Sequence, residues 1–279
     1  MYDFRQFTFE ERMSKPAATE QSRSNTQPVV LGVGAPCPAN LDLASRLQDC
    51  TPEDPRIMTM ISTTHSTMTT AHDAKFWDGV ARKYAAGSIR DLDAFENTLS
   101  RVGELLKPDD HVLELGCGTG TAALRIAPAV ASYLATDISP EMIAIAREKA
   151  DSQPVPQLHF EATTADALAE RGDRYDAVLG FNYIHLVDDL ERTLTLIRAM
   201  VKPGGYFITK TPCVGQMNQL IRLAIPILQF IGKAPSRVHP VNATQLAHLM
   251  EKAGFKIIAT EYHGTKGKDV RPFFVAQNT

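Results

Sequence analysis

The chain has 279 residues, of which 44% are hydrophobic and 22% charged, a composition typical of a globular protein with a buried core. Its net charge of -3 and its lack of clustered Lys and Arg argue against a general nucleic-acid-binding protein. The four cysteines lie far apart and form no Cys-x-x-Cys pair. Neither a zinc ribbon nor a disulfide framework is therefore expected.

Nothing in the sequence predicts a membrane span or a targeting signal. The longest apolar stretch, residues 220–231, is interrupted by Arg222, Pro226 and Gln229, and it falls short of the roughly 18 residues that a membrane helix needs. The N-terminus has neither the basic-then-apolar pattern of a signal peptide nor the acid-poor composition of a transit peptide. We therefore expect a cytoplasmic protein without stable membrane insertion.

The first seventy residues differ in composition from the rest. No aromatic residue lies between Phe9 and Phe76, and eight of the thirteen residues from 58 to 70 are Ser or Thr. Such a segment cannot bury enough apolar surface to offset the entropy lost on ordering. We therefore expect residues 1–70 to be a mostly disordered extension, and residues 71–279 to form a single folded domain.

From there on, helical and strand patterns alternate. Apolar residues at steps of three and four predict a helix over about 92–106. Short apolar runs predict strands at 111–115, 132–137, 158–162, 175–181 and 206–210, and later at 256–262 and 272–276. Helices are expected from about Thr121, after the caps Ser139 and Asn242, and around Leu190. Alternation of this kind predicts an α/β fold, a parallel sheet with helices on both faces.

The most specific motif follows the first predicted strand and opens the next helix. It reads Glu-x-Gly-x-Gly-x-Gly, with Glu114, Gly116, Gly118 and Gly120 at the named positions. In doubly wound sheets, ligands bind beyond the carboxyl ends of the strands. Glycines there let the backbone turn tightly and approach a ligand, and the helix start offers free N–H donors. This loop is therefore the predicted cofactor site; a purely structural turn, with Glu114 as a cap or surface charge, is the alternative.

Two further acids strengthen this interpretation. Asp137 ends the second strand, where a carboxylate can accept both hydroxyls of a ribose. Asp166 follows the third strand and could accept from the exocyclic amine of an adenine. A dinucleotide fold would require a third glycine where this chain has Thr121. A nicotinamide-dependent oxidoreductase is thus the weaker alternative.

In these motifs the chain resembles the class I S-adenosylmethionine-dependent methyltransferases, in particular the small-molecule group that includes the ubiquinone and menaquinone biosynthesis methyltransferases. The resemblance covers roughly residues 76–210 and, more loosely, the remainder to 279. It rests on Phe76-Trp77-Asp78, Lys83-Tyr84, Leu113–Gly120, Ala135–Met142, Ala165–Ala167, Tyr175–Val178 and Val201–Gly205. It implies S-adenosyl-L-methionine as the cofactor. It also implies a Rossmann-like three-layer sandwich, with a seven-stranded, mostly parallel sheet in the order 3-2-1-4-5-7-6 and an antiparallel seventh strand.

The resemblance assigns five residues to the methionine end of the cofactor. Gly116 and Gly118 would pass under the methionine part, and Glu114 would help hold its amino group. Tyr84, from an N-terminal helix, would close over the carboxylate. Asn182, just after the fourth strand, would face the methyl group.

The remaining assignments concern the adenosine end. Asp137 would bind the ribose, and Ile138 would lie against the adenine. Asp166 and the backbone of Ala167 would read the edge of the adenine ring. No Asp/Glu/His cluster has metal-like spacing, so no metal ion is expected.

Methyl transfer from a sulfonium needs alignment and exclusion of water more than it needs a base. His185 is the candidate base, because it follows the fourth strand and can be neutral near pH 7. Alternatively, it packs beside Asn182 and Tyr183.

Residues 216–232 are too apolar to stand in water, which predicts a lid over the substrate site. Such a lid favours a hydrophobic or aromatic small-molecule acceptor. An extra core helix or a dimer contact would explain the same pattern. A non-catalytic protein that binds S-adenosylmethionine is the second alternative function.

Overall fold

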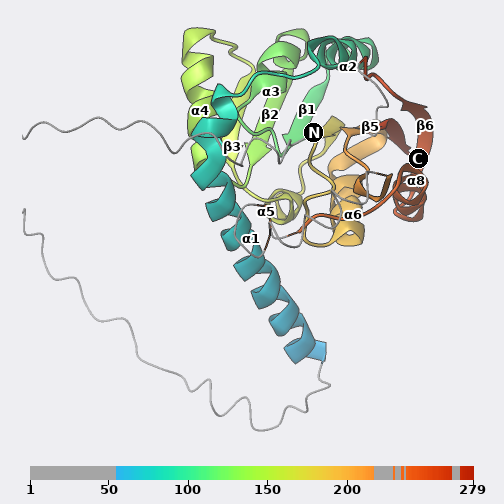
Figure 1. Cartoon of the computed structure of the whole chain (residues 1–279). Coiled ribbons are helices and arrows are strands. Elements are labelled where there is room, and N and C mark those ends of the chain that lie inside the picture. The colour runs from blue at the N-terminus through green and yellow to red at the C-terminus, as the bar shows by residue number, and fades with distance from the viewer. Residues whose placement is uncertain (1–54, 217–228, 230–233, 236, 266–270) are drawn as a thin grey trace, which may run out of the picture. The chain divides into compact units, whose positions relative to one another are not determined.

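The computed structural model describes residues 55–216, 229, 234–235, 237–265 and 271–279 (Figure 1). Contacts divide the chain into two units, Met1–Met60 and Ile61–Thr279. In the first unit, the described residues 55–60 are helical. The second unit contains the sheet and the site described below. Within the predicted lid, 216–232, only residues 216 and 229 are described, and the remainder lies outside the described residues.

Seven strands form one sheet in the order β3-β2-β1-β4-β5-β7-β6. The strands are β1 (His111–Leu115), β2 (Ser132–Asp137), β3 (Leu158–Ala162), β4 (Tyr175–Phe181), β5 (Val201–Lys210), β6 (Phe255–Glu261) and β7 (Phe273–Asn278). Neighbours from β3 to β5 pair in parallel, and β7 runs antiparallel to both β5 and β6. The expected strand order and the antiparallel seventh strand are thereby confirmed.

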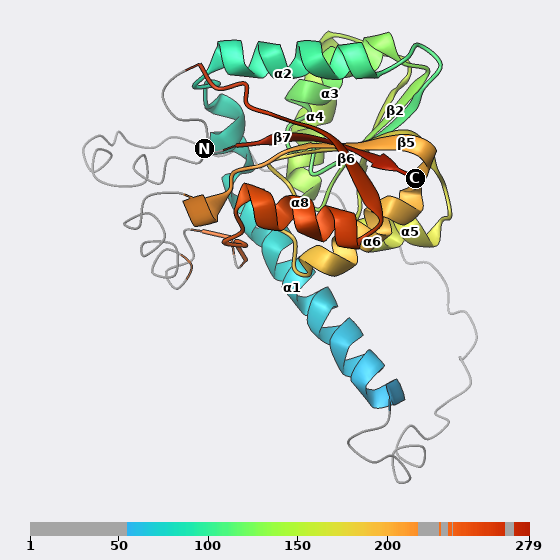
Figure 2. The same ribbon diagram turned by 90° about the vertical axis from the view of Figure 1, so that its right-hand side faces the viewer.

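Helices cover both faces of the sheet, as Figure 2 shows. One face carries α2 (Leu92–Leu105), α3 (Thr121–Ile126) and α4 (Pro140–Ser152), and the other carries α5 (Ala165–Glu170), α6 (Leu190–Met200) and α8 (Ala243–Lys252). Successive side chains of a strand point to opposite faces. Val112 therefore joins the core under α2 and α3, whereas Leu113 joins the core under α6 and α8. The result is the predicted three-layer sandwich.

Local sequence signals account for the helix starts. The Ser139 hydroxyl accepts from the backbone N–H of Met142 at 3.1 Å, and Pro140 occupies the first turn of α4. Asn242 and Gln245 form a reciprocal capping box at the start of α8. Both caps were predicted from the sequence, and both are confirmed.

Two boundaries differ from the sequence prediction. Helix α1 spans Pro55–Ala86, so residues 55–70, expected to lack order, are helical. Each residue added to an existing helix forms a backbone hydrogen bond, and no proline interrupts the extension. Strand β5 begins at Val201, which pairs with Tyr175 across a bulge, rather than at Tyr206. The Pro-Gly-Gly sequence lies inside this irregular stretch and hid the earlier start. Residues 1–54 lie outside the described residues.

Candidate active site

The loop after β1 is a tight turn that only glycine can make. Gly116 has φ +68°, and a Cβ atom there would lie 2.6 Å from the ring of Tyr183. Gly120 has φ +72°, and its Cβ would lie 2.8 Å from the ring of Phe160. Both positions combine a left-handed backbone with no room for a side chain. The loop therefore brings bare backbone to the carboxyl edge of the sheet.

Asp137, at the end of β2, is fixed against this loop. Its Oδ2 accepts from the backbone N–H of Gly118 and its Oδ1 from that of Ser139, both at 2.9 Å. Burial raises the pKa of the carboxyl, and these two hydrogen bonds oppose the rise. Two candidate residues nineteen positions apart, Gly118 and Asp137, thus meet at adjacent strand ends.

Glu114 lies beneath the loop and is 2% exposed. The hydroxyl of Tyr133 donates to its Oε2 at 2.8 Å. Burial raises the pKa of the Glu114 carboxyl to about 7, the Tyr133 bond opposes the rise, and the charge of Asp137 adds to it. A carboxyl with this pKa can keep its proton while unliganded and release it when a cation approaches.

Asp166 lies in the first turn of α5. The guanidinium of Arg192, on α6, donates twice to its Oδ1, at 3.0 Å from Nε and 2.5 Å from Nη2. Both of these bonds go to Oδ1, and neither involves Oδ2. The hydroxyl of Thr164 caps α5 by accepting from the backbone N–H of Ala167 at 3.2 Å. Ile138 is half-buried next to Asp137.

Asn182 and Tyr84 belong to other parts of the chain: Asn182 follows β4, and Tyr84 lies on α1. Asn182 has φ +52°, a left-handed conformation shared by no other non-glycine residue in the described part of the chain, and its N–H donates to Lys210 O at 2.8 Å. Tyr84, near the end of α1, is 44% exposed. Its ring lies 3.7 Å from where a Cβ on Gly118 would sit. Tyr84 thus lies beside the loop, and its contact with a methionine carboxylate stays a prediction.

His185 follows β4 and is 4% exposed. Its Nδ1 lies 2.8 Å from the hydroxyl of Thr211, just after β5, and its carbonyl accepts from the N–H of His239 at 2.8 Å. Burial lowers the pKa of the imidazole to about 3. The ring is therefore neutral near pH 7 and is tied to the chain segments that follow β5.

Three residues that contact this site were not predicted from the sequence. Asp78 contacts Ser139, Arg192 contacts Asp166, and Thr211 contacts His185. Asp78 was visible only as part of the Phe76-Trp77-Asp78 motif, with no role attached. Arg192 gave no signal, because its contact with Asp166 depends on how α5 packs against α6. Thr211 meets His185 only through the pairing of β4 with β5.

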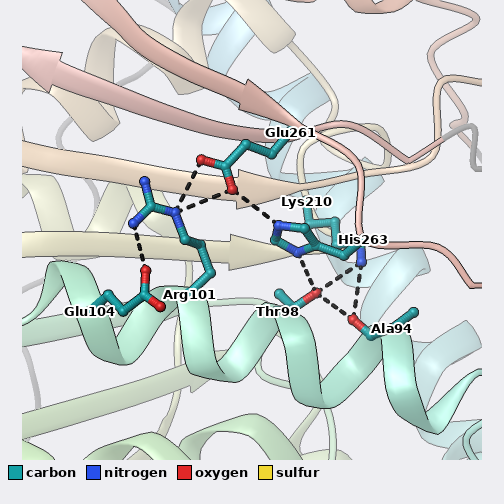
Figure 3. Close-up of polar contacts among 7 residues, drawn as sticks. All are labelled: Ala94, Thr98, Arg101, Glu104, Lys210, Glu261 and His263. Atoms are coloured by element: carbon teal, nitrogen blue, oxygen red, sulfur yellow. Dashed lines mark hydrogen bonds and ion pairs between the residues drawn. The ribbon is translucent and has the colours of Figure 1, made fainter.

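A second polar cluster lies between α2 and the ends of β5 and β6 (Figure 3). Lys210 Nζ donates to the hydroxyl of Thr98 at 2.8 Å, and His263 Nδ1 lies 3.0 Å from the same oxygen. Glu261 joins His263 to Arg101, with 3.2 Å to His263 Nε2 and 3.0 Å to Arg101 Nε. This cluster fixes α2 on the sheet and includes none of the predicted cofactor residues.

The described ranges hold no helix long and apolar enough to cross a membrane. The same ranges contain no group of three or more His, Cys, Asp or Glu residues that could hold a metal ion.

Fold and loop together define a Rossmann-like domain with a glycine loop and an acid at the carboxyl edge of its sheet. The family model described as "Methyltransferase domain" matches residues 84–260, more than half of the chain. The chain belongs to this family, and its folded unit is an S-adenosylmethionine-dependent methyltransferase domain. The resemblance read from the sequence is thereby confirmed.

Similar sequences include ubiquinone biosynthesis O-methyltransferases. The enzyme of Cereibacter sphaeroides is 34% identical over 185 residues, which cover 63% of this chain and 69% of that enzyme. The enzyme of Rhizobium etli is 37% identical over 101 residues, which cover 36% of this chain and 40% of that enzyme. The aligned region thus spans less than half of the Rhizobium enzyme.

Solved structures share the fold. Magnesium protoporphyrin IX methyltransferase from Synechocystis PCC 6803, with bound SAH, has a TM-score of 0.55 at 19% identity and covers 78% of this chain and 99% of that chain. A methyltransferase from Thermotoga maritima, titled a possible histamine N-methyltransferase, has a TM-score of 0.55 at 21% identity and covers 74% and 99%. At these identities the likeness concerns the fold alone.

Proposed function

We propose that this protein transfers the methyl group of S-adenosylmethionine to a small hydrophobic or aromatic acceptor. The observation that carries the cofactor part is the hydrogen bond from Gly118 to Asp137, which joins the glycine loop to the acid at the end of β2. The acceptor class rests on the apolar sequence of residues 216–232 and on the relatives, which are named as ubiquinone biosynthesis O-methyltransferases.

The adenosine part would be held by acids. Each carboxylate oxygen of Asp137 can accept more than one hydrogen bond, so ribose hydroxyls can bind while Gly118 and Ser139 remain bound. Oδ2 of Asp166 would accept from the adenine amine, with Arg192 holding Oδ1. Ile138 would pack against the ring, and Ala167 would contribute through its backbone.

The methionine part would lie over Gly116 and Gly118. Glu114, once ionised, would attract the amino group, and Tyr84 would cover the carboxylate. Asn182 would face the methyl group from the end of β4. The cofactor supplies the activated methyl group, so these residues need only orient it and exclude water.

His185 could act as a general base or as a packing residue, and its burial and contacts favour the packing role. A general base works best with a pKa near the working pH, whereas burial lowers the pKa of this imidazole to about 3. Its bond to Thr211 and the bond from His239 suit a side chain that positions the segments after β4 and β5. We therefore propose that His185 shapes the acceptor site rather than removing a proton.

The test is methyl transfer from methyl-labelled S-adenosylmethionine to a panel of acceptors: hydroxylated aromatics, apolar amines and, as polar controls, amino acids. We expect label in an aromatic product, and loss of at least about 99% of the rate in Asp137→Ala. Asp151→Ala, which changes an exposed acid at the end of α4, is the matched control and should retain activity. Cofactor binding without transfer to any acceptor would support the non-catalytic alternative, and transfer only to the polar controls would refute the acceptor class.

A further inference from the structure

The C-terminal part of α1 packs on α4 through a small apolar cluster. Ala81, Met142 and Ile145 are buried there, with Trp77 and Ala85 packed against them. Arg82 adds ion pairs to Glu141 and Glu148, with 2.8 Å and 2.7 Å between nitrogen and oxygen. These charges are exposed, so the pairs contribute little to stability.

Asp78 adds hydrogen bonds that are less exposed than the Arg82 ion pairs. Its Oδ1 accepts from the hydroxyl of Ser139 at 2.6 Å and from the backbone N–H of Glu141 at 3.1 Å. Glu141 lies in the first turn of α4, where backbone N–H groups lack partners within the helix. A carboxylate from α1 thus supplies an acceptor to the positive end of α4. Hydrogen bonds to a charged acceptor are stronger than neutral ones.

Ser139 connects this contact to the cofactor site. The residue is fully buried, and its backbone N–H donates to Asp137 Oδ1 at 2.9 Å. Asp78, Ser139 and Asp137 therefore form one chain of hydrogen bonds. The charge of Asp78 also contributes to the raised pKa of the Asp137 carboxyl, which places the two acids in the same electrostatic environment.

Tyr84 follows Asp78 on the same helix and lies beside Gly118. When Asp78 holds α1 against α4, it thus places Tyr84 at the glycine loop. Asp78 thus lies between the two ends of the proposed cofactor site: it is hydrogen-bonded to Ser139 beside Asp137, and it is on the helix that carries Tyr84.

We propose that Asp78 is a positioning residue that couples the docking of α1 to cofactor binding. This inference rests on the proposed function, because it takes Asp137 and Tyr84 to contact the cofactor. In this role Asp78 acts through other residues: it holds Ser139, and through it Asp137, while keeping Tyr84 beside the loop.

The chain provides its own probe of docking, since Trp77 is the single tryptophan and precedes Asp78. We would measure S-adenosylhomocysteine affinity by calorimetry and Trp77 accessibility by acrylamide quenching. The variants are Asp78→Ala and Asp78→Asn, which keeps one acceptor oxygen without the charge. Arg82→Ala is the matched control, because it removes ion pairs of the same interface without touching Ser139.

We expect Asp78→Ala to weaken S-adenosylhomocysteine binding about tenfold or more. The affinity of Asp78→Asn should lie between those of Asp78→Ala and the wild type. The affinity of Arg82→Ala should stay within about twofold of the wild-type value. Cofactor should shield Trp77 from acrylamide in the wild type and in Arg82→Ala, but much less in Asp78→Ala. Circular dichroism establishes that each variant is folded; if Asp78→Ala is not, Asp78→Asn carries the comparison.

Unchanged affinity and unchanged Trp77 shielding in a folded Asp78 variant would overturn the inference. If the wild type itself fails to bind S-adenosylhomocysteine, the proposed function fails instead. The docking of α1 on α4 is then tested without ligand. Trp77 should be more accessible to acrylamide in Asp78→Ala than in Arg82→Ala, and equal quenching in the two variants would refute a role of Asp78 in docking as well.

Discussion

Glu114 is a buried carboxyl with its pKa raised to about 7, and it lies on β1, two residues before Gly116 of the glycine loop. In the unfolded chain the same group titrates near its ordinary value of 4.5. Between these two values the folded state holds a proton that the unfolded state has released. The contribution of Glu114 to stability is therefore fully present below pH 4.5 and is lost as the pH rises toward 7.

The glutamine in Glu114→Gln cannot ionise. The free energy of unfolding of this variant should therefore fall less than that of the wild type between pH 4.5 and pH 7. The difference should be about 3 kcal/mol. Urea unfolding at several pH values in this window measures it. Parallel stability profiles for the two proteins would show that Glu114 ionises as freely in the folded state as in the unfolded chain.

Gly120 faces two constraints, a positive φ and a lack of space, whereas Gly172 faces only the first. Gly172 has φ +75°, and a Cβ there would meet nothing within 4 Å. Gly172→Ala should cost about 1 kcal/mol through backbone strain. Gly120→Ala should cost at least about 2 kcal/mol more, because its Cβ meets Phe160 at 2.8 Å and Ala146 at 3.0 Å. Equal losses in chemical denaturation would contradict the packing argument.

At the scale of elements, most strand and helix positions followed from local sequence signals. The strand 111–115 was predicted with its observed bounds because an apolar run is enclosed by polar turns. The meeting of Asp137 with Gly118 was also predictable, since parallel strands end at one edge. Contacts such as Asp78 to Ser139 were not, because they depend on how two helices pack rather than on any local pattern.

The cluster of Figure 3 shows how one hydroxyl can hold an element in place. Thr98, on α2, contacts Lys210 and His263 from the ends of β5 and β6. Its hydroxyl also donates to Ala94 O at 2.7 Å. Two polar side chains from distant parts of the sequence therefore share this buried oxygen as a partner.

Thr98→Val keeps the shape of the side chain and removes the shared oxygen. We expect it to lower the free energy of unfolding by about 1–3 kcal/mol, because buried polar groups lose a hydrogen bond. Thr195→Val is the control: its hydroxyl donates to Glu191 O on the exposed side of α6, so the change should stay within about 0.5 kcal/mol. Equal effects in thermal or urea unfolding would mean that the cluster does not secure α2.

On the scale of the whole molecule, the parallel strands of the sheet end at one edge, where the candidate site lies. Helices contribute further side chains to it, such as Arg192 on α6 and Tyr84 on α1. The glycine loop follows β1, Asp137 ends β2, and Asn182 follows β4. Family membership is established by the match over residues 84–260. We propose that these residues hold different parts of one cofactor.

Calorimetric titration with S-adenosylhomocysteine and with NAD, on the wild type and on Asp137→Ala, tests this assignment most directly. We predict that the wild type binds S-adenosylhomocysteine at a single site and does not bind NAD. In Asp137→Ala, binding should weaken by a factor of about 100, the loss of two hydrogen bonds to a charged acceptor. Binding of NAD alone, or undiminished binding of S-adenosylhomocysteine by the variant, would contradict the account.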